Sequence, residues 1–166
     1  PIYLLGSSSF SAHLAGEKGL PYAFASHFAP AHLYDALRLY REYFRPSAQL
    51  EMPYSMACVN VIAADTDAEA NRLATSLYQF AMGIVTNVRR PLPPPVETMD
   101  GIWNKAQEAM IKNMMHYTFI GSKKTIAERL SEFVANTRVD EIIAVSHIYD
   151  HKVRLRSYEI LREIFF

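Results

Sequence analysis

Serines follow a short apolar run near the beginning of the sequence. Residues 2–5 are apolar, and Gly6-Ser7-Ser8-Ser9-Phe10-Ser11 comes next, where a helical pattern begins. At a turn between a strand and a helix N-terminus, unpaired N–H groups and the helix dipole favour an anion, commonly phosphate. Serine hydroxyls add donors, and a glycine lets the backbone approach closely. The pattern therefore predicts either a phosphate-binding turn or an ordinary N-cap, for which serine is a favoured residue.

Two histidines follow expected strands. His27 comes directly after an apolar run at 22–26, and His147 comes after a run at 141–146. His27 is a candidate for lining a substrate pocket or for general acid–base chemistry near neutral pH, and equally for a hydrogen-bonded loop histidine. For the second loop we favour a structural interpretation, in which Asp150 caps the last helix. No histidine pair has a recognised metal-ligand spacing, so we predict no metal.

Several other polar residues are expected to be structural. Arg89-Arg90 can reach an anionic ligand, but two neighbouring arginines are more often solvated, and we expect the same of Lys123-Lys124. The run Pro93-Pro94-Pro95 fits a rigid loop better than a polyproline ligand for a partner domain. Cys58 lies in an apolar run and is expected to be a buried thiol, which suits a reducing cytoplasm.

Composition narrows the class of protein. The chain has 166 residues, of which 50% are hydrophobic and 20% charged, so a folded globular core is expected. Lys+Arg and Asp+Glu both number 17, which gives no basic field for a nucleic acid. No apolar run approaches the roughly 20 residues that span a bilayer, and no signal peptide is visible. We therefore predict a cytoplasmic protein without a nucleic-acid or membrane partner.

Strand and helix patterns alternate along the chain. The expected strands are 2–6, 22–26, 54–63 and 141–146. Helical patterns follow at 10–18, from Pro30 to Pro46, from Thr66 to about Met82, around 102–115, after Gly121-Ser122 and at about 150–164. Thr66 and Glu69 have the spacing of a capping box. Residues 85–100 form a long proline-rich excursion, which in a compact domain is often functional.

Four strands that alternate with helices define an α/β protein. The pattern fits either an open doubly wound sheet or half of a (β/α)8 barrel, because a whole barrel needs eight strands and about 250 residues. The chain also begins at Pro1 rather than at a methionine. We expect it to be a fragment of a longer protein.

Several segments, taken in order, resemble one family. They are Leu5-Gly6-Ser7-Ser8-Ser9-Phe10-Ser11-Ala12, Gly19-Leu20-Pro21-Tyr22-Ala23-Phe24-Ala25-Ser26-His27-Phe28-Ala29-Pro30, Tyr40-Arg41-Glu42-Tyr43-Phe44-Arg45-Pro46-Ser47, Val59-Asn60-Val61-Ile62-Ala63-Ala64-Asp65-Thr66, Phe119-Ile120-Gly121-Ser122 and Asp140-Glu141-Ile142-Ile143. The chain resembles the bacterial luciferase-like flavin monooxygenases, and within them the stand-alone, alkanal monooxygenase-like oxidoreductases. The resemblance covers essentially the whole chain.

The resemblance implies a fold and a cofactor site. It implies the C-terminal half of a TIM-type (β/α)8 barrel, with βα units five to eight, an insertion near 85–115, and residues 1–166 as a single partial domain. In the luciferases the variable segment includes a mobile loop over the active site. The resemblance places the FMN phosphate on Gly6, Ser7, Ser8, Ser9 and Ser11, with hydroxyls from Ser8 and Ser11. It leaves the catalytic residues unknown, with His27 as a candidate pocket residue.

The resemblance also implies an activity. The expected reaction of the full-length protein is an FMN-dependent monooxygenation, in which reduced FMN serves as a cosubstrate and O₂ oxidises a small organic molecule such as an aldehyde. A flavin reductase is an expected partner, and the fragment alone is expected to be inactive. One alternative is an F420-dependent hydride-transfer oxidoreductase. Another is a catalytically silent flavin-binding or structural half-barrel, whose uncovered edges would make it a homo-oligomer.

Overall fold

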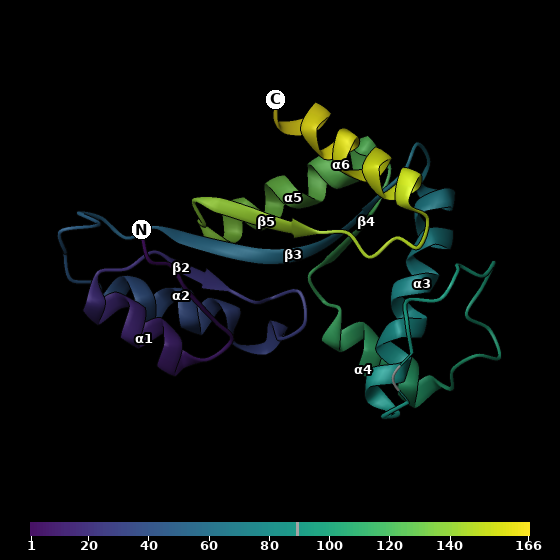
Figure 1. Ribbon diagram of the computed structural model, residues 1–166, viewed down its shortest axis with the longest axis horizontal. Helices are drawn as coiled ribbons and strands as arrows, with labels where there is room; N and C mark the ends of the chain where they lie inside the picture. Colours follow the sequence, from purple (N-terminus) through teal and green to yellow (C-terminus); the bar gives the residue numbers. More distant parts are fainter. Residues whose placement is uncertain (89) are drawn as a thin grey trace. The chain divides into compact units, whose positions relative to one another are not determined.

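The computed structural model describes residues 1–88 and 90–166, and its trace is shown in Figure 1. Contacts divide the described chain into two compact units. The first comprises Pro1–Val59 and Phe133–Ala144, and the second comprises Asn60–Glu132 and Val145–Phe166. Arg89, one of the arginines singled out in the sequence, lies outside the described residues.

Within residues 1–88 and 90–166, five strands pair in one sheet. Its order is β1 (Leu4–Gly6), β2 (Tyr22–Phe24), β3 (Ser55–Ala63) and β4 (Thr118–Gly121), and β5 (Glu141–Val145) also pairs with β3. β1 pairs with β2, β2 with β3, and β3 with β4, all in parallel. Every residue of β3 is buried. The expected strand at 54–63 is apolar nearly throughout, which is typical of a strand in a parallel sheet covered on both faces.

The helices occur where the sequence predicted them. They are α1 (Ser9–Lys18), α2 (Leu33–Glu42) preceded by a 3-10 turn at Pro30–His32, α3 (Asp67–Val85), α4 (Lys105–Met114), α5 (Lys123–Thr137) and α6 (His151–Phe165). The expectation of four strands is wrong, because β4 is a fifth strand. It pairs with the last four residues of β3 in the register Asn60↔Thr118 to Ala63↔Gly121. Such a short segment becomes a strand because β3 is long enough to offer it a pairing edge.

In the first unit, α1 and α2 pack closely because of Gly16. A Cβ atom at Gly16 would lie 2.9 Å from the carbonyl oxygen of Tyr40, so a larger residue would push α2 away. The glycine carbonyl also accepts a hydrogen bond from the Arg45 N–H at 2.9 Å. α1 ends at Gly19, whose left-handed backbone (φ 61°) is typical of a helix C-terminus.

In the second unit, α3 packs its apolar face on the core. The core residues include Ile62, Leu73, Leu77, Ile111 and Ile148. The predicted capping box at the start of α3 is only half present. Thr66 Oγ1 accepts from the Glu69 N–H at 3.2 Å, as expected, but the Glu69 carboxylate pairs with Arg72 at 2.9 Å instead of reaching back to the cap. The nearby guanidinium competes for the carboxylate.

The excursion after α3 is attached to that helix by hydrogen bonds. Thr75 Oγ1 accepts from the Val96 N–H at 2.8 Å, and Gln79 Nε2 donates to the Pro94 carbonyl at 3.1 Å. The Tyr78 and Trp103 rings lie 5.4 Å apart. Prolines without N–H groups leave few donors in this segment, so side chains of α3 hold it. Within the described residues, no helix has both the length and the apolar character needed to cross a membrane.

Candidate functional site

The candidate ligand turn joins β1 to α1. β1 ends at Gly6, Ser8 is the N-cap of α1 with extended backbone angles (φ −138°, ψ 161°), and the helix begins at Ser9. A Cβ atom at Gly6 would lie only 2.1 Å from Ser11 Oγ. Glycine is therefore needed here because the Ser11 side chain packs against the backbone, a requirement that the sequence alone did not show.

The Ser8 and Ser11 side chains form a capping box. Ser8 Oγ accepts from the Ser11 N–H at 3.3 Å, and the Ser8 N–H donates to Ser11 Oγ at 3.4 Å. Ser11 Oγ also donates to the Ser8 carbonyl at 2.8 Å. The N-cap interpretation of the serines is thus confirmed. The phosphate interpretation stays a prediction, and the two roles are compatible because a cap leaves other first-turn donors free.

The groups left for an anion lie on the exposed side of the turn. The N–H groups of Ser9 and Phe10 belong to the first turn of α1 and so have no partner within the helix. Ser9 is exposed, and no acidic residue occupies the first helical turn. The helix dipole favours negative charge at this end. The turn therefore has the donors, and lacks the local repulsion, that phosphate binding needs.

His27 lies at the carboxyl ends of the same strands. Gly6 of β1 is in register with Phe24 of β2, and the Gly6 carbonyl accepts from the Ala25 N–H at 2.9 Å. His27 follows in the next turn, where it is half-buried with its ring centroid 4.7 Å from that of Phe28. The serine turn and the His27 loop thus share the edge at which parallel α/β sheets bind ligands. The pocket role of His27 stays a prediction.

In the second unit, His147 follows β5 and its ring stacks on Phe80. The two ring centroids are 6.1 Å apart and the planes differ by 20°. Among the described residues, the buried Nδ1 of His147 has no hydrogen-bond partner. Burial lowers the pKa of His147, and the nearby charge of Arg154 lowers it further, so the ring is neutral at pH 7. Asp150 caps α6 as predicted, with Oδ1 accepting from the Val153 N–H at 3.0 Å.

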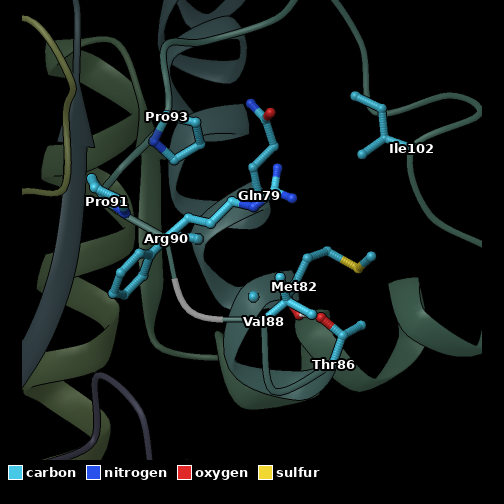
Figure 2. Close-up of a pocket in the computed structure, with 10 residues that line it drawn as sticks. Gln79, Met82, Thr86, Val88, Arg90, Pro91, Pro93 and Ile102 are labelled. Atoms are coloured by element: carbon cyan, nitrogen blue, oxygen red, sulfur yellow. Dashed lines mark hydrogen bonds between the residues drawn. The ribbon is translucent and has the colours of Figure 1, made fainter.

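A hollow of about 220 Å³ lies between α3 and the proline-rich excursion. Phe80, Met82, Val88, Pro91, Pro93 and Ile102 provide most of its apolar lining. Figure 2 shows the Arg90 side chain extending between these prolines and Gln79. Arg90 is exposed, as expected for a solvated arginine. No sequence motif predicted this hollow, because its lining combines one helix face with an irregular segment.

The described residues contain no group of three or more histidine, cysteine or acidic side chains placed to hold a metal ion. The parallel sheet, with helices after its strands, has the architecture of a partial (β/α)8 barrel. The serine turn at the carboxyl end of β1 is its candidate anion site. This agrees with the half-barrel that the family resemblance implied.

Residues 1–141 match the model of the luciferase-like monooxygenases, so the chain belongs to this family. It is 47% identical over 164 residues to the uncharacterized protein YvbT of Bacillus subtilis, and 42% identical to a luciferase-like monooxygenase of Escherichia coli K12. Each match covers 99% of this chain and 49% of the relative. The chain therefore spans about half the length of the curated relatives it matches.

Several solved structures share the fold of this chain. The crystal structure of apo-MsnO8 is 30% identical, with a TM-score of 0.82, over 98% of this chain and 50% of that one. The oxygenating constituent of 3,6-diketocamphane monooxygenase from Pseudomonas putida, solved with FMN, has a TM-score of 0.62 at 20% identity over 96% and 46% of the two chains. An F420-dependent secondary alcohol dehydrogenase has a TM-score of 0.61 at 12% identity over 100% and 49%. The last two show a shared fold alone.

Proposed function

We propose that this chain is the phosphate-binding part of an FMN-dependent monooxygenase that uses O₂ to oxidise an organic substrate. The observation that carries the proposal is the turn between β1 and α1, where first-turn N–H groups and serine hydroxyls surround an exposed helix N-terminus. Family membership supports a flavin-type cofactor, since flavin monooxygenases share the fold. Reduced FMN, when bound, supplies the electrons that activate O₂.

In this proposal, the residues of the turn bind and orient rather than react. The N–H groups of Ser9 and Phe10 donate to the phosphate, and the hydroxyls of Ser7, Ser8 and Ser11 add donors. Gly6 keeps the backbone close enough for Ser11 to reach the turn. Residues of this turn would hold the phosphate tail of FMN at the carboxyl end of β1 and so help to orient the cofactor.

The hollow beside α3 is our candidate for receiving the apolar part of the substrate. Its lining is mainly apolar, with Gln79 and Arg90 as polar groups, and it is too small for a whole drug-sized ligand. An aldehyde with a short hydrocarbon chain fits such a lining.

Binding of three flavins tests the cofactor. FMN, riboflavin and F420 are titrated into the purified chain, and binding is followed by flavin fluorescence and absorbance. The expected result is an affinity for FMN at least tenfold above that for riboflavin, because only FMN carries the phosphate. Equal affinities for FMN and riboflavin would overturn the phosphate site, and preferential binding of F420 would favour the hydride-transfer alternative.

Activity requires the rest of the barrel. We infer that a separately produced polypeptide, corresponding to the half of the Bacillus subtilis relative that this chain does not match, restores activity when the two are mixed. Turnover is measured with reduced FMN, supplied chemically or by a flavin reductase, O₂ and a short-chain aldehyde. No turnover by the mixture, despite FMN binding, would favour the silent flavin-binding alternative.

We also infer that a second copy covers the edge of the sheet when the chain is alone. β1 is a terminal strand, and Leu5 is 62% exposed on it, beside exposed Ile2 and Tyr3. Exposed apolar edge strands tend to pair with another chain. Sedimentation of the chain should show a dimer or larger assembly, and a stable monomer would contradict this inference.

The free, buried Cys58 fits a reducing cytoplasm, where we place the protein.

A further inference from the structure

Tyr22 is buried beneath the serine turn. It is the first residue of β2, and none of its surface is exposed. Its hydroxyl lies 3.1 Å from Ser11 Oγ and 3.4 Å from the Ser8 carbonyl oxygen. All three residues belong to the first compact unit. A buried hydroxyl on the neighbouring strand thus reaches both polar groups that hold the turn.

Each hydroxyl at this turn can donate only one hydrogen bond. The Ser11 hydroxyl has one proton, which it donates to the Ser8 carbonyl at 2.8 Å. That proton is therefore not available to an anion while this hydrogen bond is made. The Ser8 carbonyl also accepts from the Ala12 N–H at 3.3 Å, as part of the helix. If the Ser11 proton turns away, this carbonyl loses its shortest hydrogen bond unless another donor replaces it.

The Tyr22 hydroxyl is placed to be that donor. Its one proton goes to Ser11 Oγ at 3.1 Å while the Ser11 hydroxyl donates to the Ser8 carbonyl, and that carbonyl lies within reach at 3.4 Å. Burial raises the pKa of Tyr22, so the hydroxyl stays protonated at neutral pH. Packing fixes its position, because the ring centroid lies 5.4 Å from that of Tyr40 and 6.4 Å from that of Phe24.

We propose that Tyr22 is a positioning residue for the phosphate turn. Its hydroxyl donates to the Ser8 carbonyl when the Ser11 hydroxyl turns to donate to the FMN phosphate. The exchange changes no protonation state, since each hydroxyl keeps its proton and only the acceptors change. The proposal rests on the proposed function, because it requires an anion at this turn.

The variant Tyr22→Phe removes the hydroxyl and keeps the ring. Its dissociation constant for FMN should rise about 5- to 20-fold, as expected for one lost hydrogen bond beside a charged ligand, while that for riboflavin should stay unchanged. The matched control is Tyr40→Phe. The Tyr40 hydroxyl also hydrogen-bonds to backbone carbonyls, those of Leu20 and Tyr54. Neither Leu20 nor Tyr54 belongs to the serine turn. This control should leave the ratio of the two affinities unchanged.

A double-mutant cycle separates positioning from general destabilisation. In a Ser11→Ala background the exchange cannot occur, so Tyr22→Phe should cause no further change in the ratio of FMN to riboflavin affinity. An unchanged FMN affinity in folded Tyr22→Phe, or an equal loss for both flavins, overturns the role of Tyr22. A wild-type chain that does not prefer FMN to riboflavin overturns the proposed function instead, so the two failures are distinguishable.

A measurement on the wild-type chain covers the case in which Tyr22→Phe does not fold. The chain is labelled with ¹³C at the tyrosine ζ carbons, and the Tyr22 resonance is assigned through contacts to the Tyr40 ring. FMN should shift this resonance because the phenol changes its acceptor, whereas riboflavin should not. A Tyr22 resonance that responds equally to both flavins, or to neither, overturns the proposal.

Discussion

The variant Ser8→Asp separates the two roles of the serine turn. In the structure Ser8 Oγ accepts from the Ser11 N–H, and an aspartate is an equally favoured N-cap that can make the same hydrogen bond. Its charge also suits the positive end of the helix dipole. The same carboxylate, however, places a negative charge where the proposal puts the phosphate. Ser8→Ala makes the opposite change, because it removes the cap without adding charge.

The expected magnitudes differ between the two variants. Ser8→Ala should lower the free energy of unfolding by roughly 1 kcal/mol, the usual effect of a lost N-cap, and Ser8→Asp should leave it nearly unchanged. For FMN binding, two unit charges about 4 Å apart repel by about 1 kcal/mol in water and about 4 kcal/mol at an effective dielectric of 20. Ser8 is exposed, so the lower end applies, and the affinity should fall about 5- to 10-fold.

Denaturation and flavin titration measure these effects. Stability is taken from urea denaturation, and the dissociation constants of FMN and riboflavin are measured at low and high salt. The loss of FMN affinity in Ser8→Asp should shrink at high salt, because the charge is screened, and riboflavin binding should be unaffected. Ser131→Ala, at an exposed serine of α5, is the control and should change neither quantity. If Ser8→Asp binds FMN as tightly as the wild type, the phosphate does not lie at this turn.

Three other outcomes follow from buried groups. Burial raises the pKa of Cys58, so a thiol reagent should modify it only as the chain unfolds, and rapid modification of the native chain would contradict its burial. Burial, with a smaller effect of Arg154, lowers the pKa of His147, so the unfolded chain binds this proton more readily. Stability should therefore fall as the pH drops below about 6.5, and His147→Gln should remove part of that decline in acid denaturation profiles. Ser157→Ala should lower the free energy of unfolding by about 1–3 kcal/mol, because Ser157 Oγ is the buried acceptor of the Ala63 N–H at 2.9 Å; urea denaturation should show the loss, and an unchanged midpoint would be evidence against it.

The sequence predicted the elements whose signals are local. Leu33, Leu37 and Tyr40 recur at intervals of four and three residues, which places them on one face of α2, and all three are buried. The apolar run at 54–63 became the buried strand β3, and Gly19 ends α1. These features depend on side-chain periodicity and on backbone conformations that few residues adopt, and both can be identified in a single sequence.

Features that depend on distant residues were not predicted. β4 has four residues and no alternation of its own, so it is a strand only because the end of β3 pairs with it. The capping box at α3 failed because Arg72, one turn further along the helix, binds the Glu69 carboxylate. The hollow beside α3 combines residues from a helix face with prolines of the excursion. In each case the structure depends on a contact with another residue or segment, and a local sequence pattern does not show which contact forms.

The serine turn shows why one pattern supported two interpretations. An N-cap side chain and a bound phosphate both accept hydrogen bonds from the unpaired N–H groups in the first turn of a helix. Serines are favoured in both, so the sequence Gly6-Ser7-Ser8-Ser9 cannot separate them. The structure adds one feature that capping does not require, because Ser8 and Ser11 complete the capping box without help. That feature is the buried hydroxyl of Tyr22 within reach of both residues, and it is the reason to test this turn for an anion.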